Sequence, residues 1–305
     1  LLKELPEFNA DKNEYTYHLR NDIKWDNGDA LSANDILFTL KVYKCVLTQN
    51  DFFKPYLQNM KDVVLDASNS LNFIIRVNKP YIQDVAIWGD IIVMQQKFYD
   101  PSGLLTQYSI SDLSNERAAA LKDPKIKAWF DNFNSEAYGF DLQKLNGLGP
   151  YKVTSWQQGQ TLVLEKKKNH WSDRSNNEME KAFAAKIIFK VSSDPNVNVL
   201  EFKKQNFDAS TTLSTKSLVQ LQNDSVFNTN YHSRFTATFN YSYACFNMRP
   251  DGNRKKIFND VKVRRAVAML IPYEQINQVI YQGQYKRQVG PVCNHKFNFN
   301  RNLKL

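Results

Sequence analysis

Strand-like and helix-like segments alternate along this 305-residue chain, and the mixture limits its possible folds more than any other feature. Residues 15–20 are rich in β-forming side chains that alternate, which predicts a strand. Ser32 and Asp35 resemble a capping box at the start of a helix. The apolar residues that follow have helical spacing: Ile36, Leu37, Leu40 and Tyr43. Residues 62–77 then predict a hairpin, which ends before Pro80.

The rest of the chain continues this mixture. The elements predicted there are a hairpin at 151–165, a strand at 185–191, a helix beginning at 194, a short helix at 214–221, strands around 236–246, and helices at 260–271 and 273–281. Gly283 is a stop signal for the last helix. Together these patterns predict α/β or α+β layers and exclude a helical bundle or a β-sandwich.

The composition is that of a folded chain without a membrane span. Apolar residues make up 42% of the sequence and charged residues 23%, which allows a buried core. No apolar run approaches the ~20 residues that a spanning helix needs. The net charge is +9, but its densest clusters, at 166–168 and 254–256, accompany no nucleic-acid-binding motif. We therefore expect no nucleic-acid partner.

The sequence lacks the common motifs of catalysis and metal binding. It contains no P-loop, no nucleophile elbow and no zinc-protease motif. The four histidines have no metal-ligand spacing, and Cys45, Cys245 and Cys293 form no C-x-x-C pair, so we expect neither metal nor cofactor. The cysteines are three buried thiols or, alternatively, one disulfide and one free thiol. Cys293 and His295 lack a third orienting group, so we expect no enzyme.

A set of motifs in a fixed order gives the chain a family resemblance. Residues 15–28 read YTYHLRNDIKWDNG, and residues 31–39 read LSANDILFT. This stretch resembles the signature of the family 5 extracellular solute-binding proteins, the oligopeptide-, dipeptide- and nickel-binding components of ABC importers. Asn27 departs from the pattern, because an aspartate is usual before the glycine.

Further segments resemble the same family in the same order. They are the hairpin at 62–80, Gly147–Tyr151 with Trp156 and 169–171, the helix that begins at 260–266, the run at 270–274, and Gly290-Pro291. Pro272 stands where the family has an aspartate. The resemblance covers nearly the whole chain, and residues 101–141 are its least family-like part.

The resemblance implies an α/β fold of the type II periplasmic-binding-protein kind. Such proteins have two lobes joined by hinge strands, and peptide binders carry an extra α+β subdomain. Residues 1–142 would be mostly that subdomain, residues 143–238 part of lobe I, and residues 239–305 the start of an incomplete lobe II. The ends would then be cuts in a longer chain, and we expect this stretch alone to bind ligand poorly.

The resemblance also implies a function. The protein would be the monomeric substrate-binding component of an ABC importer, a periplasmic protein or an envelope-anchored lipoprotein. It would close on peptides and deliver them to a membrane permease. Three alternatives remain open: a binder of a nickel chelate, a haem-like group or a sugar; a hydrolase or transferase; and a signalling or adhesion protein.

A cleft-lining segment follows from the same resemblance. The residues it implies as substrate-binding are Tyr243, Phe246, Asn247 and Met248. Asn247 offers both a donor and an acceptor to a peptide bond. Alternatively, Asn247 ends a strand and satisfies its own turn.

Overall fold

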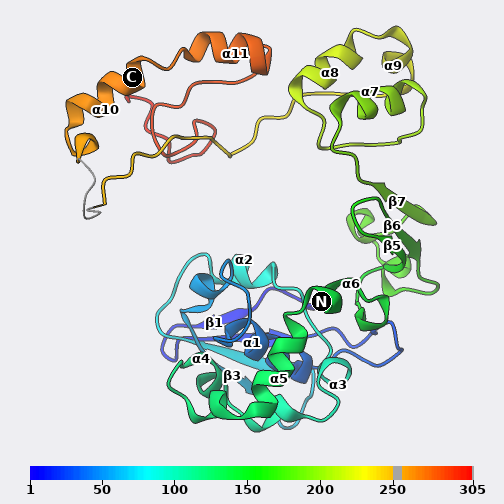
Figure 1. Ribbon diagram of the computed structural model, residues 1–305. Coiled ribbons are helices and arrows are strands. Elements are labelled where there is room, and N and C mark those ends of the chain that lie inside the picture. The colour runs from blue at the N-terminus through cyan, green and yellow to red at the C-terminus, as the bar shows by residue number, and fades with distance from the viewer. Residues whose placement is uncertain (250–255, 304–305) are drawn as a thin grey trace. The chain divides into compact units, whose positions relative to one another are not determined.

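The computed structural model describes residues 1–249 and 256–303 (Figure 1). The chain divides into two compact units, residues 1–191 and residues 192–305. The domain boundaries predicted at 142 and 238 fall inside these units and stay predictions. Each unit is described below by itself.

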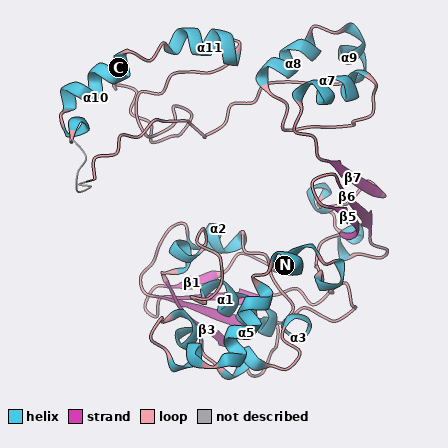
Figure 2. Ribbon diagram, in the orientation of Figure 1, coloured by secondary structure: helices cyan, strands magenta, loops and turns pink. Residues whose placement is uncertain are grey.

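The first unit begins with a four-stranded antiparallel sheet of order β1-β2-β4-β3. Figure 2 draws its strands in magenta. Its strands are β1 (Glu7–Asn9), β2 (Glu14–His18), β3 (Met60–Leu65) and β4 (Asn72–Val77). The central pairing places Tyr17 opposite Phe73, and the two rings stack with centroids 4.8 Å apart. The strand predicted at 15–20 and the hairpin predicted at 62–77 are therefore confirmed.

Helix α1 (Ala33–Lys44) packs on this sheet through the face that its spacing predicts. The side chains of that face join the core of the sheet: Ile36, Leu37, Leu40 and Tyr43. The opposite face of α1 is apolar as well, and it makes a second core with later segments. Buried members of the second core are Phe38, Val42, Cys45, Leu105, Leu113, Ile126 and Phe130. Helix α1 is thus a central layer between a sheet and a group of short helices.

Short helices between residues 84 and 140 complete this part of the first unit. Their bounds are α2 (Asp84–Gly89), α3 (Gln96–Tyr99), α4 (Ile110–Ser114), α5 (Pro124–Phe133) and α6 (Glu136–Phe140). Asp123 caps α5, because its carboxylate accepts the Lys125 N–H at 2.8 Å. Residues 101–141, the least family-like stretch, therefore supply much of the second core.

A second sheet of order β5-β6-β7 ends the first unit. Its strands are β5 (Tyr151–Gln157), β6 (Thr161–Lys166) and β7 (Lys186–Lys190), which confirms the predicted hairpin and strand. Lys167, just after β6, forms an ion pair with Asp26 and donates to the Gly147 carbonyl oxygen at 3.1 Å. Asp26 also accepts the Gly147 N–H at 3.0 Å. These contacts attach the second sheet to the turn after the first sheet's β2.

The second unit contains helices α7 (Pro195–Lys203), α8 (Thr215–Gln222), α9 (Ser225–Asn230), α10 (Val261–Met269) and α11 (Tyr273–Tyr281). The first three share a small core of Val199, Phe202, Leu221 and Phe227. Asp194 caps α7 by accepting the Asn196 N–H at 2.8 Å. Gln282 and Gly283 have left-handed backbone at the end of α11, where Gly283 was expected as the stop.

One element prediction is wrong. Residues 236–246, all described, form no strand. Their alternation of aromatic and polar residues is typical of a strand, but a strand needs a neighbour to satisfy its backbone groups. Tyr241 and Tyr243 are exposed, so this extended segment lacks both a ladder and a core.

The turn between β3 and β4 supports a pH-dependent prediction. Asp66 accepts the Ser68 hydroxyl at 2.6 Å and the Ser68 N–H at 2.9 Å, and these bonds lower the pKa of its carboxyl to about 2. Its stabilising effect is present above the unfolded value of 3.8 and is lost as pH falls through about 2. We expect Ser68→Ala to raise the Asp66 pKa in an NMR titration. Ser70→Ala, in the same turn, should leave it unchanged.

Candidate ligand-binding site

Two of the four predicted binding residues line a hollow in the second unit. The hollow has a volume of about 240 Å³. The described residues of its lining are Asn247, Met248, Arg249, Lys256, Ile257, Phe258 and Asn259. Phe246 is not in this lining but contacts one of its residues, with its ring centroid 4.9 Å from that of Phe258. Tyr243 does not line the hollow; it is 73% exposed and contacts Tyr241.

One wall of the hollow is fixed by helix α10. Residues Ile257–Asn259 form a 3₁₀ turn directly before the helix. Asp260 caps α10 by accepting the Lys262 N–H at 2.8 Å. Arg264, one turn into the helix, donates back to the carbonyl oxygens of Phe258 and Asn259 at 2.5 and 3.1 Å. The wall residues are therefore held by a helix start and not by a free loop.

Asn247 forms its own turn, which is one part of the alternative considered for it from the sequence; the strand that this alternative placed before the turn is absent from residues 236–246, all of them described. Its Oδ1 accepts the Arg249 N–H at 3.1 Å. The side-chain amide is exposed, and its N–H donors have no partner among the described residues. The turn uses only the acceptor of Asn247, so the donor side can still bind a carbonyl or carboxylate oxygen.

The net charge of the chain lies in the unit that holds this hollow. Residues 192–305 contain sixteen Lys and Arg against seven Asp and Glu, whereas residues 1–191 contain twenty-four of each. Arg249 and Lys256 bring two cations to the lining, and none of its described residues is acidic. The potential of the hollow therefore favours an anionic group.

Sequence reasoning missed most of this lining. It named Asn247 and Met248, but not Arg249, Lys256 or the turn at 257–259. The signal was present, because Lys256 belongs to the basic cluster at 254–256, which we considered as a nucleic-acid-binding feature. The sequence does not show that Lys256 lies beside the predicted cleft segment.

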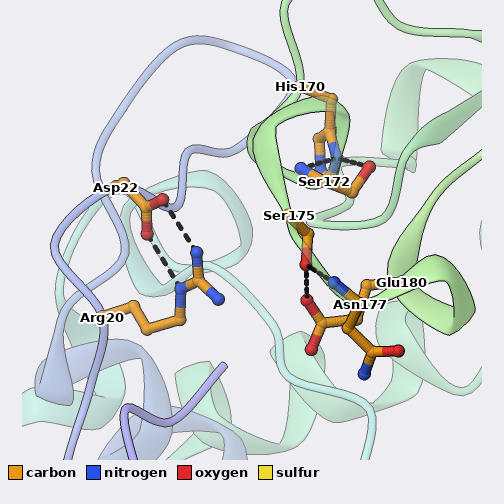
Figure 3. A network of polar contacts seen from close by, with 7 residues as sticks. All are labelled: Arg20, Asp22, His170, Ser172, Ser175, Asn177 and Glu180. Carbon is orange, nitrogen blue, oxygen red and sulfur yellow. Dashed lines mark hydrogen bonds and ion pairs between the residues drawn. The ribbon is translucent and has the colours of Figure 1, made fainter.

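A polar network in the first unit includes His170, Ser172 and Ser175, and their hydrogen bonds stabilise the fold (Figure 3). His170 Nε2 lies 3.0 Å from the Leu148 carbonyl oxygen, so this nitrogen carries the hydrogen, and Nδ1 accepts the Ser172 N–H. Ser172 is fully buried. Ser175 Oγ donates to Glu180 Oε2 at 2.5 Å and accepts the Asn177 N–H at 3.1 Å. These groups fix the loop after β6 by satisfying one another.

Arg20 and Asp22 connect that loop to the first sheet. The Arg20 guanidinium donates twice to the Asp22 carboxylate, at 2.9 Å each, and holds the pKa of Asp22 below its usual value. The same guanidinium lies 4.3 Å from the centroid of the Trp171 ring. The contacts of Arg20 with Asp22 and Trp171 therefore stabilise the fold.

The three cysteines are free thiols. Cys45 and Cys293 are buried as expected, but Cys245 is exposed, so the expectation of three buried thiols holds for two. Burial raises the pKa of the Cys45 thiol to about 11. Cys293 Sγ lies 3.6 Å from the Thr238 carbonyl oxygen and 3.8 Å from Asn294 Oδ1.

Two structural observations concern metals and membranes. Within residues 1–249 and 256–303, no group of three or more His, Cys, Asp or Glu side chains is placed to hold a metal ion. In the same residues, no helix combines the length and apolar character needed to cross a membrane.

The arrangement of helices and sheets is that of solute-binding proteins. AppA from Bacillus subtilis, solved with a nonapeptide, superposes with a TM-score of 0.66 at 14% identity, over 100% of this chain and 51% of that one. NikZ from Campylobacter jejuni, solved with Ni(L-His), gives a TM-score of 0.63 at 19% identity, over 95% and 48%. At these identities the likeness concerns the fold alone.

The chain belongs to the bacterial extracellular solute-binding proteins, family 5, whose model matches residues 1–304. Di/tripeptide-binding protein 1 of Pseudomonas aeruginosa is 22% identical over 298 residues, covering 92% of this chain and 47% of that protein. The dipeptide-binding protein of Escherichia coli is 21% identical over 301 residues, with 92% and 47% covered. The chain thus spans about half the length of these relatives. Family membership confirms the resemblance seen in the motifs.

Proposed function

We propose that this chain is part of the substrate-binding component of an ABC importer that captures peptides and delivers them to a membrane permease. Several relatives are named for dipeptide or oligopeptide binding, which supports this assignment. A ligand that contacts both lobes would stabilise the closed form by the difference between its binding free energies for the closed and the open form. We further propose that the protein acts in the periplasm or at the cell envelope, as a monomer without catalytic activity. Residues 1–142, 143–238 and 239–305 stay as the proposed subdomain and lobe segments.

The observation that carries this proposal is the hollow at Asn247 and Met248. It combines an amide with free donors, two cations and the apolar side chains of Met248, Ile257 and Phe258. A peptide has carbonyl oxygens for the amide donors, a terminal carboxylate for the cations, and side chains that can contact the apolar residues. We propose that Arg249 and Lys256 face the carboxylate, with Asn247 donating to a peptide carbonyl and Tyr243 and Phe246 adding contact area at the cleft.

The ligand carried by the protein provides a direct test. The protein should be purified from its own cells at the length at which it occurs there, and native mass spectrometry should detect retained peptides. A retained nickel chelate, haem-like group or sugar would replace the peptide assignment. Sustained turnover of peptide or ester libraries would overturn the assignment as a binding protein.

The lining residues can be tested in the same protein by calorimetry. Replacing a charged hydrogen-bond partner removes roughly 1.5–3 kcal/mol, so we expect Lys256→Met and Arg249→Met each to weaken peptide binding by about tenfold or more. Lys216→Met removes the same charge from an exposed position on α8, outside the lining, and should leave affinity nearly unchanged. Equal effects of all three substitutions would indicate general charge steering and contradict binding at this hollow.

A further inference from the structure

A second hollow lies in the first unit, away from the residues assigned to peptide binding. Its volume is about 290 Å³. It lies against the inner face of β2 and β4 and against α1, and residues 1–6 and 85–93 form its remaining sides. Apart from Thr39 and Gly89, its lining side chains are hydrocarbon or aromatic. None of the described lining residues has a charged side chain.

The polar group of Thr39 is already satisfied. Its hydroxyl donates to the Asp35 carbonyl oxygen at 2.7 Å and accepts the Met94 N–H at 2.8 Å. Thr39 therefore offers nothing to a ligand, and the polar character of the hollow depends on its aromatic residues.

Two aromatic lining residues have polar atoms without partners. Tyr17 is 6% exposed and Trp88 is 8% exposed, and both line the hollow. Neither Tyr17 Oη nor Trp88 Nε1 has a hydrogen-bond partner among the described residues. Buried polar groups almost always have a partner, because an unmade bond leaves their desolvation uncompensated. Two such groups on one apolar hollow point to a missing acceptor.

Both groups are suited to donate. The indole N–H of Trp88 is a donor only. Burial raises the pKa of Tyr17, so its hydroxyl stays protonated at ordinary pH. Asp84, one turn before Trp88 in α2, does not line the hollow, and its Oδ2 accepts from Asn59 at 2.7 Å. Its Oδ1 is buried and has no hydrogen bond to Tyr17, Trp88 or any other described residue, so Asp84 does not satisfy the two donors.

We propose that this hollow binds a small, uncharged and mostly hydrocarbon molecule with one oxygen acceptor, which accepts from Tyr17 Oη or Trp88 Nε1. No described lining side chain is cationic, and burial and, less strongly, the nearby Asp84 charge raise the pKa of Tyr17, so an anionic ligand would not recover its lost hydration here. The volume equals roughly ten waters at about 30 Å³ each, which allows a molecule of about ten non-hydrogen atoms. A carbonyl on a short hydrocarbon chain meets each of these conditions.

The test uses the 305-residue chain and two probes of equal shape. The probes are 2-octanone and 2-methyl-1-octene, which differ only in the exchange of a carbonyl oxygen for a CH₂ group. Amide NMR should show shifts at residues lining the hollow, with 2-octanone binding about tenfold more tightly. In a Tyr17→Phe, Trp88→Phe double variant the two probes should bind equally. These shifts are measured without peptide, so the result is independent of the proposed transport function.

A filling variant separates binding in the hollow from binding elsewhere. Val85→Phe places a larger side chain in the lining and should abolish binding of both probes. Val191→Phe makes the same change at a position that is 61% exposed and outside the lining, and should leave binding intact. Equal affinity of the two probes for the unaltered chain would overturn the proposal, and so would no binding of either probe. In the second case, solvent or the nearby Leu5 side chain fills the hollow.

Discussion

Asp35→Ala should lower the free energy of unfolding of the first unit by about 4 kcal/mol. Asp35 is only 4% exposed and accepts from four donors on three residues. These are the Ser32 N–H at 3.0 Å, the Ser32 hydroxyl at 3.3 Å, the Gln96 N–H at 2.8 Å and the Trp25 indole N–H at 3.3 Å. Alanine would leave the buried Trp25 indole N–H and the partly buried donors of Ser32 and Gln96 without this acceptor. Urea unfolding monitored by circular dichroism measures the change.

A matched control is available in α4. Asp112 belongs to the capping box with Ser109, and it accepts the Ser109 N–H at 2.8 Å. This box is exposed, so water replaces the lost bonds, and Asp112→Ala should cost about 1 kcal/mol. If the two substitutions cost the same, burial of Asp35 is not the cause of its effect.

The second large effect concerns the ion pair between Asp26 and Lys167. The two side chains are 11% and 16% exposed, and Lys167 also donates to the Gly147 carbonyl oxygen. Removing one member of a buried pair strands the other charge, so Lys167→Ala should cost about 3 kcal/mol. We expect urea unfolding to show this loss, together with faster hydrogen exchange at the Gly147 amide.

Another Lys–carboxylate pair in the same unit provides the comparison. Lys186 and Glu165 pair across β7 and β6 at 3.0 Å, but their side chains are 51% and 48% exposed. Lys186→Ala should cost less than about 1 kcal/mol, because water screens such pairs. An Asp26→Leu, Lys167→Met double variant should recover part of the lost stability, since it leaves no charge stranded. A loss equal to the sum of both single variants would contradict this.

The contacts of Asp35 and Asp26 explain why the family signature is recognisable at such low sequence identity. Trp25, Asp26, Asp35 and Gly147 all belong to the motifs that carry the resemblance. In the structure they contact one another or nearby backbone groups and hold the first unit together. The signature therefore reports the fold, and the ligand must be identified from other residues.

Local signals in the sequence predicted most elements of the fold. The face of α1 that meets the sheet, the two hairpins and the helix starts at 194 and 260 depend on neighbouring residues, and the structure has them. The second face of α1 was missed, because Phe38 and Val42 meet residues 60 to 90 positions later in the chain. The strand expected at 236–246 is absent because strand propensity does not supply a partner strand.

The candidate site was predictable only in part, for a similar reason. The resemblance identified Asn247 and Met248 as cleft residues, and they line the hollow. The cation at Lys256 enters the lining because the turn before α10 is held by Arg264. That arrangement comes from helix capping and side-chain packing, and one-dimensional patterns do not encode it. The cleft role of all four predicted residues stays a prediction.

The pairing of Asp26 with Lys167 also has a consequence for the order of folding. The strands of the first sheet are complete at Val77, whereas their anchor to the second sheet lies ninety positions further along the chain. At about 5–20 residues per second, a ribosome needs on the order of ten seconds to supply that lysine. During this interval the Asp26 carboxylate is without its cation. Until Lys167 is available, the first sheet and α1 are therefore stabilised by their own hydrophobic core, without the ion pair that joins them to the second sheet.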